Sequence, residues 1–242
     1  MINSDSAICI KDPSSLINIA TSKLFQSQVR ETLKIGFLYV KNDQLSQNDI
    51  LKNSWNDTSE SFRSFVKSIG TIVDLSVHTG FNGKLDSTNF SNGRYHLYYS
   101  DQRFEVLYHV APLIPTDPKD DQQIYKKRHI GNDNIHIVWT ENPLEYDPTT
   151  ISSQFNDAHV IIHPTKKNGF YRVRIYKKNE AYLFGPLQGE TIVSMRALPE
   201  LVRWTSIFSD RAARKLTSTV YKLPSLMFEE ALNDIKNSKR EN

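Results

Sequence analysis

The sequence has 242 residues and a formal net charge of +3, and 38% of its residues are apolar and 24% charged. These values are typical of a folded chain that forms one large α/β domain, and the small, dispersed positive charge argues against a nucleic-acid-binding protein. The single cysteine, Cys9, excludes a disulfide framework, and the lack of a signal peptide or of an apolar run of about 18 residues leads us to expect a cytoplasmic protein.

The chain begins with a lead-in over residues 1–11, which a helix follows. Asp12 and Pro13 have the pattern of an N-cap with proline at the first helical position, so we expect a helix that runs to about Leu33. Residues 34–40, KIGFLYV, are apolar on both alternating sets. This pattern predicts a strand that is covered on both faces and lies in the middle of a sheet.

The next segment predicts a helix, a strand and a hairpin. Residues 57–60 resemble a capping box, and they precede an apolar helical face that ends at Gly70. That face consists of Phe62, Phe65, Val66 and Ile69. Residues 71–77 predict a strand, and residues 94–100 and 104–110 predict a hairpin that turns at Asp101.

The second half continues the alternation of helices and strands. We expect a short helix from Pro118 to near Gly131, then strands over residues 135–140, 159–163 and 169–176. A long helix is expected from Leu198, and a shorter one over residues 228–235. No repeat and no Pro-, Ser- or Gly-rich linker divides the chain, so the fold class is α/β, with a mixed central sheet flanked by helices.

The motifs of self-contained catalysis are missing. The nearest approach to a phosphate-binding loop is residues 80–85, GFNGKL, in which the glycine spacing is wrong and Leu85 replaces the magnesium-binding hydroxyl. His159 and His163 are four residues apart in a predicted strand, where exposed or hydrogen-bonded histidines are expected in preference to a zinc site. We therefore expect no hydrolase activity of the chain by itself, no metal and no cofactor of its own.

Residues 126–139, KKRHIGNDNIHIVW, read as the end of a helix, a glycine break and an apolar strand. Taken locally, Gly131 and Asn132 predict a helix C-cap, because both residue types tolerate a left-handed backbone. The preceding Lys126, Lys127 and Arg128 predict a solvated last turn, which the helix dipole favours.

The run RHIGND at residues 128–133, followed at once by an apolar strand, resembles the signature of the Rap/Ran-type GTPase-activating domain family. The similarity extends, in the family's order and spacing, to residues 34–40, 62–86, 104–115, 135–142, 155–162 and 183–187. The runs IHIVWTEN and FGPL are closer in appearance to the catalytic α subunits of the Ral GTPase-activating complexes and to tuberin than to the Rap activators. The resemblance implies a G-domain-like catalytic fold.

The resemblance also implies a mechanism in which an asparagine thumb enters the active site of a small Ras-family GTPase in its GTP-bound form. By position in the motif the thumb is Asn132, and His129 matches the family histidine that supports it. The partner would bind GTP and Mg²⁺. A carboxamide can position the attacking water without titrating, whereas an aspartate would bring negative charge towards the phosphates.

The residues around the thumb have structural as well as functional interpretations. Arg128 and Lys127 are expected to contact the GTPase, and Asp133 is expected to hold the thumb loop more than to touch the partner. Phe155 is expected in the core or as support for the helix, in preference to a position at the interface. The basic residues of segment 166–178 are expected on the wet face of a strand, with a membrane or acidic partner as the less favoured interpretation. Trp139 and Trp204 are expected in the core, whereas Trp55 in a polar loop has no evident place.

We therefore predict an N-terminal segment over residues 1–33, a GTPase-activating domain over residues 34–236 and a polar tail over residues 237–242. Ral is the first expected substrate, followed by Rheb and Rap. The alternatives are a GTPase-binding scaffold domain of the same fold, which does not require asparagine at position 132, and an unrelated enzyme. Dimerisation and a second subunit are not carried over from the family, and the oligomeric state stays open.

Overall fold

The computed structural model describes residues 30–217 together with Leu226, Glu229 and Asn233. Packing divides the chain into two units, residues 1–31 with 220–242 and residues 32–219. The sheet and the helices described below belong to the second unit, except for Glu31, the first residue of the first strand, which is assigned to the first unit. The first 18 residues of the helix predicted from Asp12 to about Leu33, most of the one over residues 228–235 and the polar tail lie outside the described residues.

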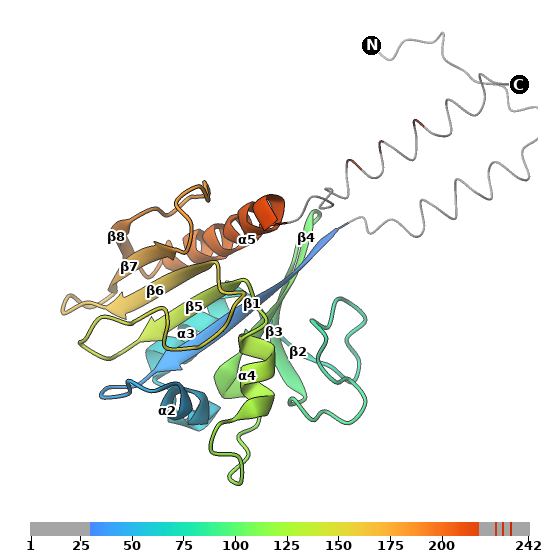
Figure 1. The fold of residues 1–242 in the computed structure, drawn as a ribbon, viewed down its shortest axis with the longest axis horizontal. Coiled ribbons are helices and arrows are strands. Elements are labelled where there is room, and N and C mark those ends of the chain that lie inside the picture. The colour runs from blue at the N-terminus through green and yellow to red at the C-terminus, as the bar shows by residue number, and fades with distance from the viewer. Residues whose placement is uncertain (1–29, 218–225, 227–228, 230–232, 234–242) are drawn as a thin grey trace, which may run out of the picture. The chain divides into compact units, whose positions relative to one another are not determined.

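The second unit contains one eight-stranded mixed sheet in the order β2-β3-β4-β1-β5-β6-β7-β8 (Figure 1). The strands are β1 (Glu31–Val40), β2 (Thr71–Asp74), β3 (Tyr95–Ser100), β4 (Phe104–Val110), β5 (Ile135–Thr140), β6 (Ala158–Pro164), β7 (Phe170–Lys177) and β8 (Glu190–Ser194). β1, β5 and β6 run parallel, whereas β2, β3 and β4 form one antiparallel flank and β6, β7 and β8 the other. The predicted α/β class with a mixed sheet is confirmed.

Helices cover both faces of this sheet. They are α2 (Gln47–Lys52), α3 (Glu60–Ile69), α4 (Ile124–Ile130) and α5 (Leu198–Thr217), with two short 3₁₀ turns, η2 (Trp55–Asp57) and η3 (Ala111–Leu113). The side chains of α3 and α5 pack in one core with Phe37 and Trp139, and those of α2 and α4 pack in another with Leu38 and Val138. Alternate residues of β1 therefore enter opposite cores, as predicted for a central strand.

β1 begins earlier than predicted. Leu33 was expected at the end of a helix, but it lies in the strand and is fully buried with Ile35 in the core shared with α3 and α5. Both a helix and a strand can place Leu33 on an apolar face, and pairing in the sheet decides between them. At the other end, β2 stops at Asp74 instead of residue 77, because the Asp74 carbonyl accepts hydrogen bonds from Val77 and His78 in a turn.

α3 has the predicted range and buried face, but its capping differs. Ser59 is the N-cap, and its side chain accepts a hydrogen bond from the Phe62 N–H, whereas Asp57 forms a capping box with Ser54 in η2. Gly70 ends the helix in an extended conformation. A Cβ atom there would lie 2.6 Å from the Tyr98 carbonyl oxygen, so this glycine permits close approach to β3.

α4 begins at Ile124, six residues later than predicted. The Asp120 carboxylate accepts hydrogen bonds from the N–H groups of Gln122 and Ile124, so residues 118–123 form turns that lead into the helix. α2 and β8 were not predicted. Each has only five or six residues, and β8 is an edge strand in which only Val193 is buried, so neither leaves a readable periodicity.

Candidate functional site

The backbone after α4 keeps its right-handed course through the glycine break. Gly131 is the C-cap of α4, as predicted, but its φ of −67° and ψ of −14° are right-handed, so the expected left-handed backbone is wrong. Its N–H donates to the Lys127 carbonyl at 2.7 Å, and the next two N–H groups donate to the carbonyls of His129 and Ile130. The backbone thus makes one further, tighter turn after α4, and this turn places Asn132 at the exposed end of the helix.

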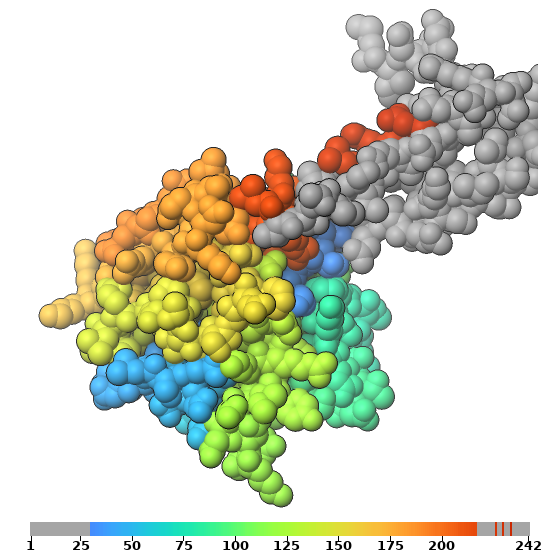
Figure 2. All heavy atoms as spheres, in the orientation of Figure 1, coloured from blue at the N-terminus to red at the C-terminus, as the bar shows by residue number. Residues whose placement is uncertain are grey.

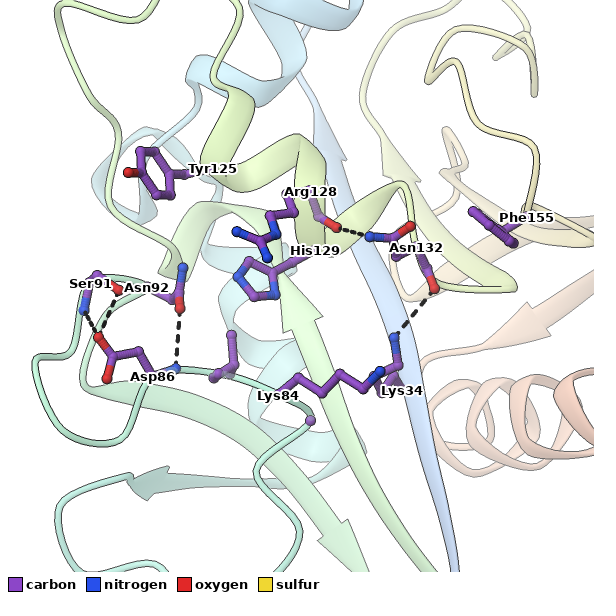
Figure 3. Close-up of a pocket in the computed structure, with 12 residues that line it drawn as sticks. Lys34, Lys84, Asp86, Ser91, Asn92, Tyr125, Arg128, His129, Asn132 and Phe155 are labelled. Carbon is purple, nitrogen blue, oxygen red and sulfur yellow. Dashed lines mark hydrogen bonds between the residues drawn. The ribbon is translucent and has the colours of Figure 1, made fainter.

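The Asn132 side chain is exposed but oriented. Its Nδ2 donates a hydrogen bond to the Arg128 carbonyl oxygen at 2.7 Å. No other described residue bonds to its Oδ1 atom. Figure 3 shows the amide nitrogen turned towards Arg128 and the oxygen turned away from it. The hydrogen bond of the amide nitrogen therefore orients the side chain so that its oxygen, a hydrogen-bond acceptor, lies at the surface.

Asp133 lies beneath Asn132 in a buried charge cluster. Its side chain is inaccessible, and one carboxylate oxygen is 2.6 Å from His109 Nδ1 while the other is 3.3 Å from Lys34 Nζ. Lys34 Nζ also donates to the Asn132 carbonyl oxygen at 3.3 Å. This burial fits the expected supporting role of Asp133 and leaves its side chain no surface for direct contact with a partner.

Two histidines connect the cluster to the helix. His109 Nε2 bonds to the Gly83 carbonyl at 3.1 Å, so both ring nitrogens of His109 face oxygen atoms, one from Asp133 and one from Gly83. The ring of His129 packs edge-on against His109 at 5.2 Å. Burial, followed by the charge of His109, lowers the pKa of His129 to about 4, so it is neutral at neutral pH.

The three basic residues of α4 have three different environments. Lys126 is fully buried, and its Nζ donates to the Asn53 carbonyl at 2.9 Å and to Thr116 Oγ1 at 2.7 Å, so the predicted solvated position is wrong. Lys127 bonds to Ser152 Oγ at 3.0 Å. Arg128 is exposed, and its side chain lines the hollow beside Asn132. The helical period explains the difference, because it directs Lys126 towards the segments that follow α2 and η3 while Arg128 faces the surface.

Asn132 stands between two hollows in the surface. The larger has a volume of about 620 Å³ and the smaller about 340 Å³, and Arg128, Asn132 and Phe155 line both. The larger is also lined by Lys34, Gly83, Lys84, Leu85, Asp86, Ser91, Asn92, Tyr125 and His129. In Figure 2 the yellow-green α4 segment lies at the surface, between the blue segment that contains α2 and the green loop that follows β2.

Phe155 belongs to the surface of this site, and the prediction that placed it in the core is wrong. Its side chain is 53% exposed and lines both hollows beside Asn132. Tyr125, which is 60% exposed, lines the larger hollow from α4. Tyr125, Lys34 and Lys84 were not predicted as site residues. Lys34 is the first residue of the predicted strand over residues 34–40 and lies within β1, and Lys84 lies in the rejected phosphate-loop match, so neither context marked a site.

The other residues singled out in the sequence lie away from Asn132. His159 and His163 were expected to be exposed or hydrogen-bonded, but both are buried, and neither nitrogen of His159 nor Nε2 of His163 has a hydrogen-bond partner among the described residues. Arg172 and Arg174 of β7 both form ion pairs with Glu145, at 2.6 and 3.3 Å, which reduces the positive charge expected on that strand. Trp139 is fully buried as predicted. Trp204 is partly buried against the same core, and Trp55 packs against Phe62.

Within the described part of the chain, no group of three or more His, Cys, Asp or Glu side chains is placed to hold a metal ion. None of the helices that the structure describes has the length and apolar character needed to cross a membrane. What distinguishes the surface at the end of α4 is an exposed carboxamide with exposed aromatic and basic neighbours, and these groups suit contact with another macromolecule.

Comparison with known proteins identifies the domain. The sequence profile of the Rap/ran-GAP family matches residues 50–234. The chain is 40% identical over 189 residues to Ral GTPase-activating protein subunit alpha-2 of Mus musculus and 39% identical to subunit alpha-1 of Homo sapiens. These alignments cover 78% of this chain and 10% and 9% of the two relatives, so the chain spans about a tenth of their length.

A solved structure of the TSC2 GAP domain matches the fold with a TM-score of 0.70 and 29% sequence identity. The match covers 77% of this chain and 98% of the solved chain. The profile, the relatives and the structure thus agree on one kind of domain, and the profile match over residues 50–234 includes Arg128, Asn132 and Phe155.

Proposed function

Because this chain belongs to the Rap/ran-GAP family and carries a GTPase-activating domain of the Rap, Ral and TSC2 type, we propose that Asn132 is the thumb that it inserts into a GTP-bound small GTPase. The observation that carries the proposal is the oriented amide of Asn132. Its nitrogen is held by the Arg128 carbonyl, and its exposed oxygen accepts no hydrogen bond from the residues that the structure describes. The partner would bind GTP and Mg²⁺, and this chain would add no cofactor.

GTP hydrolysis needs a water molecule in line with the γ-phosphate and stabilisation of the charge that spreads over its oxygens. In the proposed complex, Asn132 Oδ1 accepts a hydrogen bond from that water and fixes its direction of attack. The amide does not act as a base, because it does not titrate. Its contribution is the positioning of the nucleophile, for which a rigid support is required.

The support is the buried cluster of Asp133, His109 and Lys34. Lys34 bonds to the Asn132 carbonyl oxygen. Asp133, the residue after Asn132, joins this segment to β1 through Lys34 and to β4 through His109. The neutral His129 ring fills the space between α4 and His109. We assign His129 to support of the thumb, and Arg128 and Lys127 to contact with the GTPase. Exposed positive charge beside the thumb would also steer an acidic partner.

Ral is the first proposed substrate, because the two relatives described above are named as subunits of Ral GTPase-activating proteins. Rheb and Rap follow. A small GTPase is the partner that the family implies, and the choice among these proteins is part of the proposal.

Single-turnover GTP hydrolysis by Ral, Rheb, Rap and Ras tests the proposal. We expect the wild-type chain to accelerate at least one of them. Asn132→Ala should lower the rate in the complex by roughly 10²–10³-fold, or about 2.7–4 kcal/mol, which is the scale of removing one positioned polar group. Asn132→Asp should fail as well, since its carboxylate would face both the phosphates and the Arg128 carbonyl oxygen.

Asn168→Ala, in the turn between β6 and β7, is the matched control and should retain wild-type activity. A fully active Asn132→Ala variant would show that the thumb assignment is wrong. If the wild-type chain binds a GTP-loaded GTPase without accelerating hydrolysis, the scaffold alternative replaces the proposal.

A further inference from the structure

Lys84 lies in a turn whose backbone is unfavourable for lysine. Residues 82–85 form a tight turn that is closed by a hydrogen bond of 3.0 Å from the Leu85 N–H to the Asn82 carbonyl. Both central residues have positive φ, 63° at Gly83 and 68° at Lys84. Two consecutive positive φ values are typical of a type I′ turn, in which glycine, asparagine and aspartate dominate. A lysine is disfavoured because its Cβ crowds the following carbonyl oxygen.

The turn at residues 82–85 is hydrogen-bonded to the buried side chains that support Asn132. Gly83 is buried, and a Cβ atom there would collide with the Leu107 side chain, so no larger residue fits. Its carbonyl accepts a hydrogen bond of 3.1 Å from His109 Nε2, and His109 Nδ1 is 2.6 Å from Asp133. The backbone segments that carry Lys84 and Asn132 are therefore connected through the same buried side chain, His109.

The Lys84 side chain is exposed and lines the same hollow as Asn132 and Arg128. Figure 3 shows it extending towards Lys34, below Asn132. Its ammonium has no ion pair or hydrogen bond among the described residues. The nearby Asp86 carboxylate accepts from the backbone of Thr88 and Asn89 and from Ser91 Oγ, so it is occupied within its own turn. Lys84 is therefore a cation without a counter-ion among the described residues, and the turn fixes the position of its backbone.

An ordinary surface lysine needs no left-handed backbone, and asparagine or glycine would suit this turn better. Backbone strain that persists at a functional surface indicates that the side chain is needed there. We propose that Lys84 binds an anionic oxygen group of the GTP-loaded GTPase beside Asn132. The proposal rests on the proposed function. The oxygen group belongs either to an acidic side chain of the GTPase or to a phosphate of its nucleotide.

The test is the GTPase-activation assay with Lys84→Gly, measured over a range of GTPase concentrations at low and high salt. Glycine adopts positive φ without the Cβ penalty, so the variant should unfold at the same temperature as the wild type or higher. We expect kcat/KM at low salt to fall by about fivefold or more, and the difference to shrink at high salt because screening weakens the contact. Lys84→Asn should behave in the same way, and Lys84→Arg should retain most of the activity.

Lys166→Gly is the matched control, because it removes an exposed lysine from the turn between β6 and β7, outside the hollow. A higher KM with unchanged kcat would assign the anion to an acidic side chain, and a lower kcat with unchanged KM would assign it to a nucleotide phosphate. If Lys84→Gly is folded and keeps the wild-type kcat/KM while Asn132→Ala is inactive, the proposed Lys84 contact is wrong and the thumb assignment stands. A wild-type chain that accelerates none of the GTPases would overturn both proposals.

Discussion

Asp133 follows Asn132 in the sequence but belongs to the interior of the molecule. Its buried carboxylate is paired with His109 from β4 and with Lys34 from β1. Removing one partner of a buried charge pair is costly, because the remaining charge keeps its desolvation penalty without its attraction. The residue next to the proposed thumb therefore contributes by holding three segments together.

We expect Asp133→Asn to lower the free energy of unfolding by about 3–5 kcal/mol, since it leaves the Lys34 ammonium without its counter-ion and removes the carboxylate oxygen that faces His109 Nδ1. Urea unfolding at neutral pH measures the change. His109→Gln alone should also destabilise, whereas the double variant should cost less than the sum of the two single variants. Additive losses would contradict the direct pairing of the two side chains.

At the scale of elements, contacts between α3 and the sheet depend on how closely the two backbones approach. Arg203 from α5 bonds to the Ile69 carbonyl at the end of α3, and Gly70 then brings the chain against the Tyr98 carbonyl of β3. α4 is fixed in a different way, through the buried Lys126 amine and its contacts with Asn53 and Thr116. Each helix thus has a specific attachment beyond its apolar face.

Gly70→Ala should lower the free energy of unfolding by about 1–3 kcal/mol, because its Cβ would lie 2.6 Å from a backbone carbonyl oxygen that cannot move aside without shifting β3. Gly185→Ala serves as the control. A Cβ at that position meets no atom within 4 Å, so its effect should stay within about 0.5 kcal/mol. Equal effects of the two substitutions in thermal or urea unfolding would refute the close-approach role of Gly70.

At the scale of the whole molecule, several histidines are buried on or beside the sheet in the neutral form. Burial lowers the pKa of His96 and His129 to about 4, and it also lowers the pKa of His136 and His159. His159 packs between aromatic rings, and neither of its ring nitrogens has a hydrogen-bond partner among the described residues. The folded state therefore resists protonation that the unfolded chain accepts.

Stability should consequently fall as the pH drops from about 6.5 towards 4. In this window the unfolded state binds more protons at each of these histidines, and each contributes a slope of about 1.4 kcal/mol per pH unit. Asp157 and Asp210, whose pKa values burial raises, act in the opposite direction but are fewer. Urea unfolding at a series of pH values would measure the slope.

His159→Phe isolates one of these contributions. Phenylalanine keeps a ring among the same aromatic neighbours and removes the titrating nitrogens, so the variant should be more stable at pH 5 and lose about 1.4 kcal/mol per pH unit from the slope. An unchanged slope would mean that His159 is not kept neutral by the fold.

Much of the molecule could be predicted from the sequence, because local patterns carried the information. The apolar run of residues 34–40 indicated a central strand, the hairpin and the long helix from Leu198 had clear periodicity, and RHIGND with its flanking segments indicated the family. The site was only partly predictable. Asn132 came from the motif, whereas the exposure of Phe155 and the burial of Lys126 depend on which neighbours the sheet brings to them.

The sequence by itself determined the alternation of strands and helices, the family and the position of the candidate thumb, since each of these is written in residues that are close along the chain. Only the tertiary structure joined Lys34, Gly83, His109 and Asp133, which come from four separate segments. It also decided that the lysine of a discarded phosphate-loop match faces the hollow beside Asn132. Burial and pairing of charge are properties of segments brought together across the sheet, and no local spacing records them.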